Sequence, residues 1–146
     1  MYKKILLATD GSDGALKAAE TAAQLAKEFG AHVTMLYVST LPVELVPVGL
    51  VTGGGLDPGT VARLSEGIED AVARRTAKVL DDAGVKFDAR HETGHAADHI
   101  VRAAAEGGYD LIVLGSHGHG GIARLFLGST SDRVVHHAHC PVLVVK

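Results

Sequence analysis

The stretch LIVLGSHGHGGIARLFLGST, residues 111–130, is the most informative part of the sequence for the fold and for a possible binding site. Its first four residues, Leu111 to Leu114, form a continuous apolar run, which is typical of a short strand buried on both faces. Residues 115–130 then contain five glycines. A glycine-rich segment at the mouth of a buried strand can be a phosphate-binding loop, a histidine-based metal site or only a flexible connection.

Outward from this stretch, apolar runs alternate with helical patterns. Strands are predicted at 5–8, 32–38, 85–90, 111–114 and 141–145, and helices at about 15–29, 61–80, 96–106 and 131–138. Ser12 or Asp13 is expected to cap the first helix and Gly30 to end it. Residues 39–60 hold three of the four prolines and are interpreted as a long loop. The run 85–90 alternates apolar and polar residues, which indicates an edge strand with one wet face.

Strict alternation of short apolar strands with helices predicts an α/β fold with a parallel sheet covered on both faces. Right-handed crossovers then favour a single doubly wound, Rossmann-like sheet of five strands in the order 3-2-1-4-5, formed by one domain over residues 1–146. Such sheets bind ligands beyond the carboxyl ends of the strands, where the winding reverses. Here that point lies between the first and fourth strands, beside the loops 10–13 and 115–130.

Composition narrows the possible partners. The net charge of −3 differs from the basic footprint of a nucleic-acid-binding protein, so no nucleic acid is expected. No segment approaches the ~20 apolar residues of a membrane span, so no membrane partner is expected either. The single cysteine, Cys140, excludes an intramolecular disulfide and suits a reducing compartment, and we expect a cytoplasmic protein. Cys140 abuts a predicted buried strand and is interpreted as inert packing.

Two familiar phosphate motifs do not account for the glycine loop. A P-loop needs a lysine directly after its last glycine, and Gly128 is followed by Ser129. Residues 118–123 match G-x-G-x-x-A formally. A dinucleotide site needs that motif after the first strand, however, with an acidic residue about twenty positions later.

A third pattern fits the loop better, namely Gly115-x2-Gly118-x9-Gly128-Ser129. Glycines let a backbone turn sharply and approach a ligand without an intervening Cβ. Ser129 and Asp132 resemble a capping box at the start of the next helix. An anion there would meet free N–H groups, hydroxyl groups and the positive end of the helix dipole. A phosphate chain can bridge the two ends of this loop.

The histidines offer a competing hypothesis. His95 and His99 are four residues apart on a predicted helix, a spacing compatible with two metal ligands. No Cys, Asp or Glu completes a recognisable set, so no metal site is assigned. His117 and His119 lie within the glycine loop, where their titration near neutral pH could modulate phosphate binding.

Together, these motifs make the sequence resemble the universal stress protein family, and specifically its ATP-binding branch. The loop pattern precedes a terminal strand reading PVLVV, and the chain opens with KKILLATDGSD. The segment GYDLIVLGSHG is similar to the fourth strand of the family. The resemblance covers the whole chain.

The resemblance implies an ATP-binding stress-response module that forms a homodimer through its C-terminal strand, with Mg²⁺ or Mn²⁺ carried by the nucleotide. It implies that Asp10 lies near the ribose and that Thr9 and Val38 line the adenine pocket. Position 9 often carries proline in the family, and this chain has threonine there, a departure that concerns the adenine contact and not the phosphate site. The residues implied to hold the phosphates are Gly115, Gly118, Gly128, Ser129 and Thr130.

Two rival functions remain open. One is a genuine ATP hydrolase or phosphotransferase, although residues 115–131 hold one arginine, two histidines and no carboxylate. Because phosphoryl transfer needs charge stabilisation and a positioned nucleophile, slow hydrolysis at most is expected and no catalytic residue is assigned. The other is a dimeric interaction module without nucleotide binding.

Overall fold

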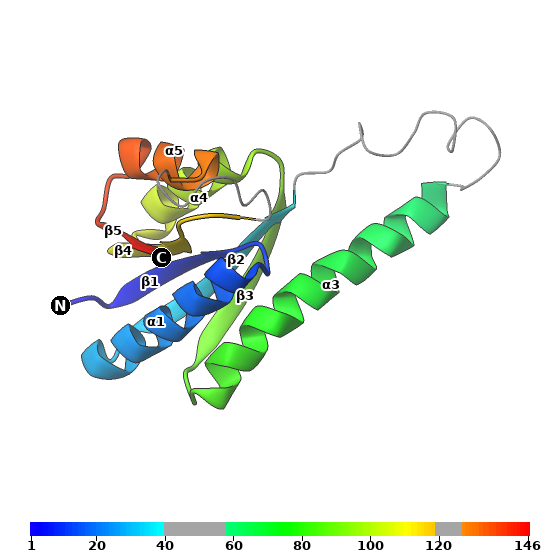
Figure 1. The fold of residues 1–146 in the computed structure, drawn as a ribbon. Helices are drawn as coiled ribbons and strands as arrows, with labels where there is room; N and C mark the ends of the chain where they lie inside the picture. Colours follow the sequence, from blue (N-terminus) through cyan, green and yellow to red (C-terminus); the bar gives the residue numbers. More distant parts are fainter. Residues whose placement is uncertain (40–57, 119–126) are drawn as a thin grey trace.

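A computed structural model describes residues 1–39, 58–118 and 127–146. Five parallel strands form one sheet in the order β3-β2-β1-β4-β5, as predicted (Figure 1). The strands are β1 (Lys4–Thr9), β2 (His32–Ser39), β3 (Phe87–Thr93), β4 (Leu111–Gly115) and β5 (Val142–Val145). The helices are α1 (Asp13–Phe29), α3 (Pro58–Asp82), α4 (Ala96–Gly107) and α5 (Ser129–His137). The strand order reverses between β1 and β4.

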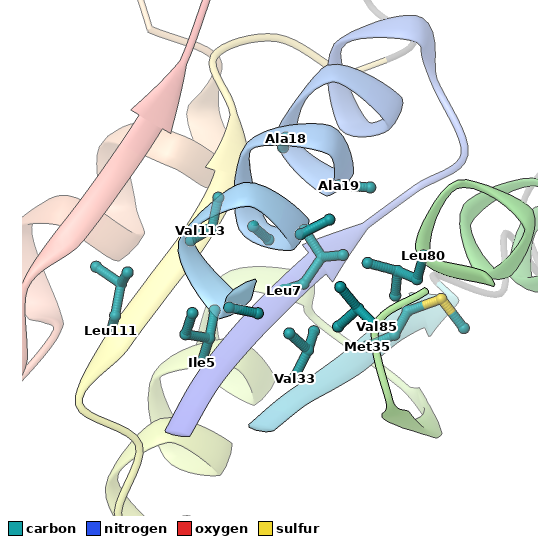
Figure 2. Packing of buried hydrophobic residues seen from close by; sticks show 13 residues of the cluster. Ile5, Leu7, Ala18, Ala19, Val33, Met35, Leu80, Val85, Leu111 and Val113 are labelled. Atoms are coloured by element: carbon teal, nitrogen blue, oxygen red, sulfur yellow. The ribbon is translucent and has the colours of Figure 1, made fainter. Parts of the chain in front are cut away.

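The central strands are apolar throughout because helices cover both faces of the sheet. Ile5 and Leu7 of β1 pack toward α1 and α3, in the cluster drawn in Figure 2. Leu6, between them, packs toward α4 and α5. All three side chains are fully buried. Successive strand residues point to opposite faces, so a two-sided core requires a continuous apolar run.

Helix α1 begins and ends as its sequence predicts. The Ser12 side chain accepts a hydrogen bond from Ala15 N at 3.3 Å, which places the cap on Ser12 rather than Asp13. Gly30 ends the helix in the left-handed conformation, with φ of 62°. The face turned to the sheet consists of buried alanines, which are Ala15, Ala18, Ala19, Ala22, Ala23 and Ala26. Their small side chains bring the helix close to the strands.

Several predicted boundaries differ from the structure. Helix α3 begins at Pro58, inside the interval interpreted as a loop, and proline suits a first turn because its missing N–H has no intrahelical partner. Residues 40–57 of that interval lie outside the described residues. Helix α5 begins at Ser129 rather than about 131. Strand β3 begins at Phe87, two residues later than expected, and residues 85 and 86 precede the sheet.

The two outer strands expose different side chains. Strand β3 is an edge strand, as predicted, but the expected alternation of a buried and a wet face holds only as far as Asp88, because Ala89 is exposed. Only Phe87 and Glu92 are half-buried and the other five residues are exposed, because the packed cores lie under β1, β2 and β4. All four residues of β5, at the opposite edge, are half-buried and apolar.

None of the helices in the described ranges combines the length and apolar character required to cross a membrane.

Candidate functional site

A cavity of about 680 Å³ opens where the strand order reverses, beyond the carboxyl ends of β1, β2 and β4. All eight residues singled out from the sequence line it: Thr9, Asp10, Val38, Gly115, Gly118, Gly128, Ser129 and Thr130. They come from three separate parts of the chain. The parallel sheet brings these parts together because its strands all end at the same edge.

The two ends of the glycine loop are joined directly. Gly128 N donates to Ser116 O at 2.7 Å, which ties the approach to α5 back to the end of β4. The Ser131 hydroxyl donates to Gly115 O at 2.7 Å and lies 3.3 Å from Ser116 O. Ser131 is buried, and its hydroxyl fastens α5 to the end of β4. Residues 119–126, which include His119, lie outside the described residues.

The glycines are required partly for packing between loops. A Cβ on Gly115 would lie 2.9 Å from the carbonyl carbon of Gly14 and 3.2 Å from Ala15 N, both backbone atoms of α1. A Cβ on Gly128 would lie 3.2 Å from Ser116 O. The sequence predicted glycine here for close approach to a ligand, and the structure adds a close approach to neighbouring backbone.

The start of α5 corrects one prediction. The N-cap is Gly128 and no side chain caps the helix, so the capping box of Ser129 and Asp132 is wrong. Ser129 is instead the first helical residue. The hydroxyls of Ser129 and Thr130 have no hydrogen-bond partner among the described residues, and both residues line the cavity. The first-turn amides also lack intrahelical partners, so this wall offers several donors.

Asp10 lies where the β1–α1 loop meets the glycine loop. Its Oδ1 accepts a hydrogen bond from Ser12 N at 2.9 Å, which fixes the carboxylate against its own loop. Its Oδ2 points toward Gly118, where an added Cβ would be only 2.6 Å away. The carboxylate is half-buried and borders the cavity.

The Thr9 side chain is already committed within the protein. Its Oγ1 lies 2.8 Å from Thr76 Oγ1 and accepts a hydrogen bond from Gly11 N at 3.1 Å. Thr9 therefore borders the cavity with a hydroxyl whose hydrogen bonds go to its own loop and to α3. Val38 is half-buried and packs on the opposite side of the sheet, with the cluster beneath α4.

Sequence reasoning missed the apolar half of the cavity. Ala8, Leu36, Ala96, Ile100 and Leu114 line it from the side of α4, and Ile68 and Val72 line it from α3. The strand residues among them carried a usable signal, because they lie at the carboxyl ends of strands that flank the reversal point. The α3 residues carried none, since helical periodicity does not specify which end of a sheet a helix overhangs.

Tyr37, also missed, adds a polar group to the cavity wall. Its ring stacks on His91 with centroids 5.3 Å apart and planes at 19°. Burial raises the pKa of the Tyr37 phenol, and the carboxylates of Glu69 and Asp10 raise it further. The phenol therefore stays protonated at neutral pH and can donate a hydrogen bond.

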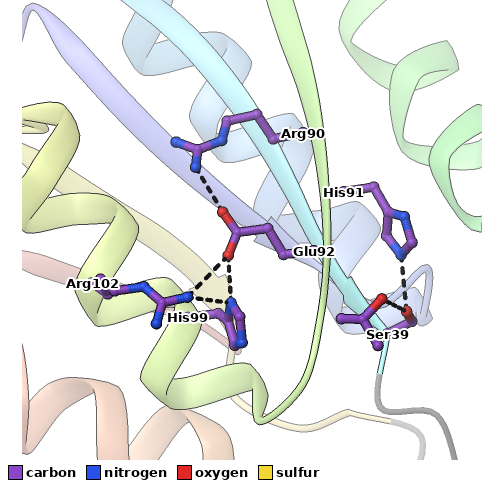
Figure 3. Close-up of polar contacts among 7 residues, drawn as sticks. Ser39, Arg90, His91, Glu92, His99 and Arg102 are labelled. Atoms are coloured by element: carbon purple, nitrogen blue, oxygen red, sulfur yellow. Dashed lines mark hydrogen bonds and ion pairs between the residues drawn. The ribbon is translucent and has the colours of Figure 1, made fainter.

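The two histidines considered as metal ligands have other partners. His99 Nδ1 contacts Glu92, which also receives Arg90 at 2.6 Å and approaches Arg102 at 3.7 Å (Figure 3). His95 lies 3.5 Å from Asp98. No group of three or more metal-ligating side chains occurs within the residues that the structure describes.

Cys140 is half-buried against the cluster beneath α4, in line with its interpretation as packing. Burial, followed by the nearby Asp110 carboxylate, raises the pKa of its thiol. The thiolate is the reactive form of cysteine, so this environment disfavours reactivity.

The close contact at Gly115 yields a stability prediction. Gly115→Ala should lower the free energy of unfolding by about 1–3 kcal/mol, because its methyl group has backbone rather than a movable side chain to displace. Urea unfolding measures the change. Gly67→Ala is the control, since a Cβ there meets nothing within 4 Å and alanine favours an exposed helix. Equal stability of Gly115→Ala and wild type would contradict the packing role.

A second prediction concerns Glu92, whose pKa is lowered chiefly by its hydrogen bond to His99 and further by Arg90. A carboxyl group whose pKa is lowered by folding stabilises the fold at pH values above its unfolded-state pKa. This stabilisation is lost as the pH falls through the folded-state pKa. The stability advantage of wild type over Glu92→Gln should therefore shrink as the pH drops below about 4.5. Urea unfolding across the acidic range tests this. The exposed Glu66→Gln serves as control, and an advantage that stays constant with pH would refute it.

The universal stress protein family model matches residues 1–146. Universal stress protein MJ0531 of Methanocaldococcus jannaschii is 42% identical over 147 residues, covering 100% of this chain and 83% of that protein. The solved structure of the hypothetical protein MJ0577 has a TM-score of 0.78 at 28% identity, covering 100% of this chain and 96% of that one.

A universal stress protein solved in complex with cAMP has a TM-score of 0.71 at 25% identity, covering 99% of this chain and 96% of that one. The family match extends over residues 1–146, and the solved structures share the fold. The chain therefore belongs to the universal stress protein family.

Proposed function

We propose that this chain binds ATP, with Mg²⁺ or Mn²⁺ carried by the nucleotide, and acts in the cytoplasm as a nucleotide-dependent stress-response module. One observation carries the proposal: a single cavity has an apolar wall on one side and the unpartnered donors of Ser129, Thr130 and the first turn of α5 on the other. ATP matches these two walls, because it joins an apolar ring to a polyanion that accepts hydrogen bonds.

The cavity can accommodate such a ligand. Its volume of about 680 Å³ falls inside the range of small-molecule sites. The base would lie against the apolar wall near Val38 and the end of β1 at Thr9, with Asp10 beside the ribose. The phosphates would extend past Gly115, Gly118 and Gly128 to the first turn of α5, where amides without intrahelical partners and the positive end of the helix dipole favour negative charge.

The divalent cation would depend on the nucleotide for most of its ligands. Mg²⁺ usually keeps several waters and binds through phosphates and one or two carboxylates, without a dedicated protein cage. Asp10 is the carboxylate that borders the cavity in the described residues. The related protein solved with cAMP supports an adenine nucleotide over other anions.

We propose a homodimer through β5 on separate grounds. Strand β5 lies at the edge of the sheet and its residues are apolar and half-buried, so a second copy could pair with it. Light scattering on purified protein should give twice the mass of the chain. A monomeric mass across the accessible concentrations would refute this part of the proposal.

The nucleotide proposal predicts that freshly purified, denatured protein releases ATP, ADP or AMP detectable by mass spectrometry. Titration calorimetry with Mg²⁺-ATP should show binding that Gly118→Ala weakens by about tenfold or more, since its methyl group would displace the Asp10 carboxylate. Gly67→Ala, which adds the same methyl group on the exposed face of α3, should bind like wild type.

The same variants separate the rival functions. Absence of binding by wild type would favour an interaction module without nucleotide. Rapid metal-dependent turnover that both Gly118→Ala and Asp10→Ala abolish would favour a hydrolase or phosphotransferase instead. Slow or absent turnover with intact binding is the result expected of a signalling module.

A further inference from the structure

Helix α3 holds the β1–α1 loop from the side opposite the glycine loop. Arg75 Nη1 donates a hydrogen bond to Gly11 O at 2.9 Å. The Val72 side chain packs against Gly11, whose Cβ position lies 3.1 Å from both Val72 methyl groups. Gly11 is buried and has φ of 74°, a conformation that side chains rarely adopt. The residue following Asp10 is therefore fixed by its own backbone geometry and by α3.

A chain of hydroxyl groups makes the second connection. Thr76 Oγ1 lies 3.3 Å from Val72 O, to which its hydroxyl can donate. The hydroxyl oxygens of Thr9 and Thr76 are 2.8 Å apart and share a hydrogen bond that either hydroxyl can donate. Thr9 Oγ1 in turn accepts from Gly11 N at 3.1 Å. These contacts connect the Gly11 amide, through the hydroxyls of Thr9 and Thr76, to α3.

These contacts fasten both sides of Asp10. The preceding residue, Thr9, is tied to Thr76, and the following residue, Gly11, is tied to Arg75. Asp10 itself bonds within the loop, to Ser12 N. Neither Arg75 nor Thr76 lines the cavity that Asp10 borders. The residues on both sides of Asp10 are therefore tied to side chains of α3.

We propose that Arg75 and Thr76 are positioning residues that set nucleotide affinity by holding Asp10 in place, without touching the nucleotide. The proposal rests on the nucleotide-binding function proposed above and extends it to residues outside the cavity. In this proposal α3 holds the β1–α1 loop in position and also forms one wall of the cavity.

A direct role for Arg75 is the main alternative. Arg75 lines a second cavity on the α1 side of the loop, with Lys17 and Lys146, and a phosphate reaching there would meet its charge. Its guanidinium also lies 3.6 Å from Asp13. The experiment must therefore separate loop positioning from direct attraction of an anion.

Affinity for Mg²⁺-ATP, measured by titration calorimetry, supplies the first comparison. Arg75→Gln should weaken binding about tenfold, the size of one hydrogen bond from a charged donor. Arg74→Gln is the matched control, because this neighbouring arginine is 82% exposed and pairs with Asp70 at 3.7 Å. It should bind within about twofold of wild type, because exposed ion pairs contribute little. An equal loss in both variants would assign the effect to overall charge and overturn the proposal.

Variants of Thr76 test the positioning of Asp10 without a change of charge. Thr76→Val keeps the shape but cannot hydrogen-bond to Thr9, so binding should weaken by several-fold, whereas Thr76→Ser should restore it. Hydrogen exchange of the Gly11 amide in ligand-free protein should be faster in Thr76→Val and Arg75→Gln than in Arg74→Gln. Far-UV circular dichroism and melting temperature establish that each variant is folded. Unchanged binding by Thr76→Val would overturn the role of the hydroxyl chain.

A double-mutant cycle with Asp10→Asn decides how Arg75 acts. If Arg75 works through Asp10, Arg75→Gln should cost little further affinity once the carboxylate is gone. Additive losses would show a direct contact with the phosphates and refute the positioning role. If wild type binds no nucleotide, the proposed function fails and this inference fails with it. Normal wild-type binding that Arg75→Gln leaves unchanged refutes the inference alone.

Discussion

The site depends on the close approach of the residue that ends β4 to the first turn of α1. At Gly115 the backbone lies so near Gly14 that no side chain can stand between them. Two further bonds, from Gly128 N and the Ser131 hydroxyl, hold the approach to α5 against the same point. The start of α5 and the end of β4 thereby share one wall of the cavity, although they are separated by a long segment of chain.

This constraint gives the glycine spacing of the loop a second physical reason. The pattern was interpreted as a way to let a ligand approach the backbone, and the structure shows that Gly115 and Gly128 first let two pieces of protein backbone approach each other. Gly118 differs, because its nearest neighbour is the Asp10 carboxylate, a group at the cavity itself. A single motif therefore combines packing and site geometry, and the sequence alone does not separate these roles.

The fold was predictable where burial is two-sided. Ile5, Leu6 and Leu7 are apolar because each face of β1 meets a helix layer, and this simple relation locates a central strand. The prediction failed where the chain leaves the core. Strand β3 alternates apolar and polar residues in sequence, yet its residues are mostly exposed. An alternating pattern indicates which side chains can be buried, but it does not show whether another element covers them.

The candidate site was predictable in its polar half for a similar reason. Glycines, a serine-rich helix start and Asp10 are unusual at strand ends, whereas Ala8, Leu36 and Leu114 look like ordinary core residues and serve as both core and cavity wall. The contribution of α3 was hidden most completely. Its Arg75 and Thr76 reach the β1–α1 loop across more than sixty residues of sequence, and no local pattern encodes such a contact.

The two edges of the sheet differ in a way that bears on assembly. Strand β3 carries Asp88, Arg90 and His91 as exposed polar side chains, and charged residues on an edge strand oppose pairing with another sheet. Strand β5 carries valine and leucine only, all partly accessible. Pairing through β3 would bring these polar groups against a second copy, whereas pairing through β5 would bury apolar surface. The chemistry of the edges therefore makes β5 the more favourable strand for self-association, independently of the resemblance that first implied it.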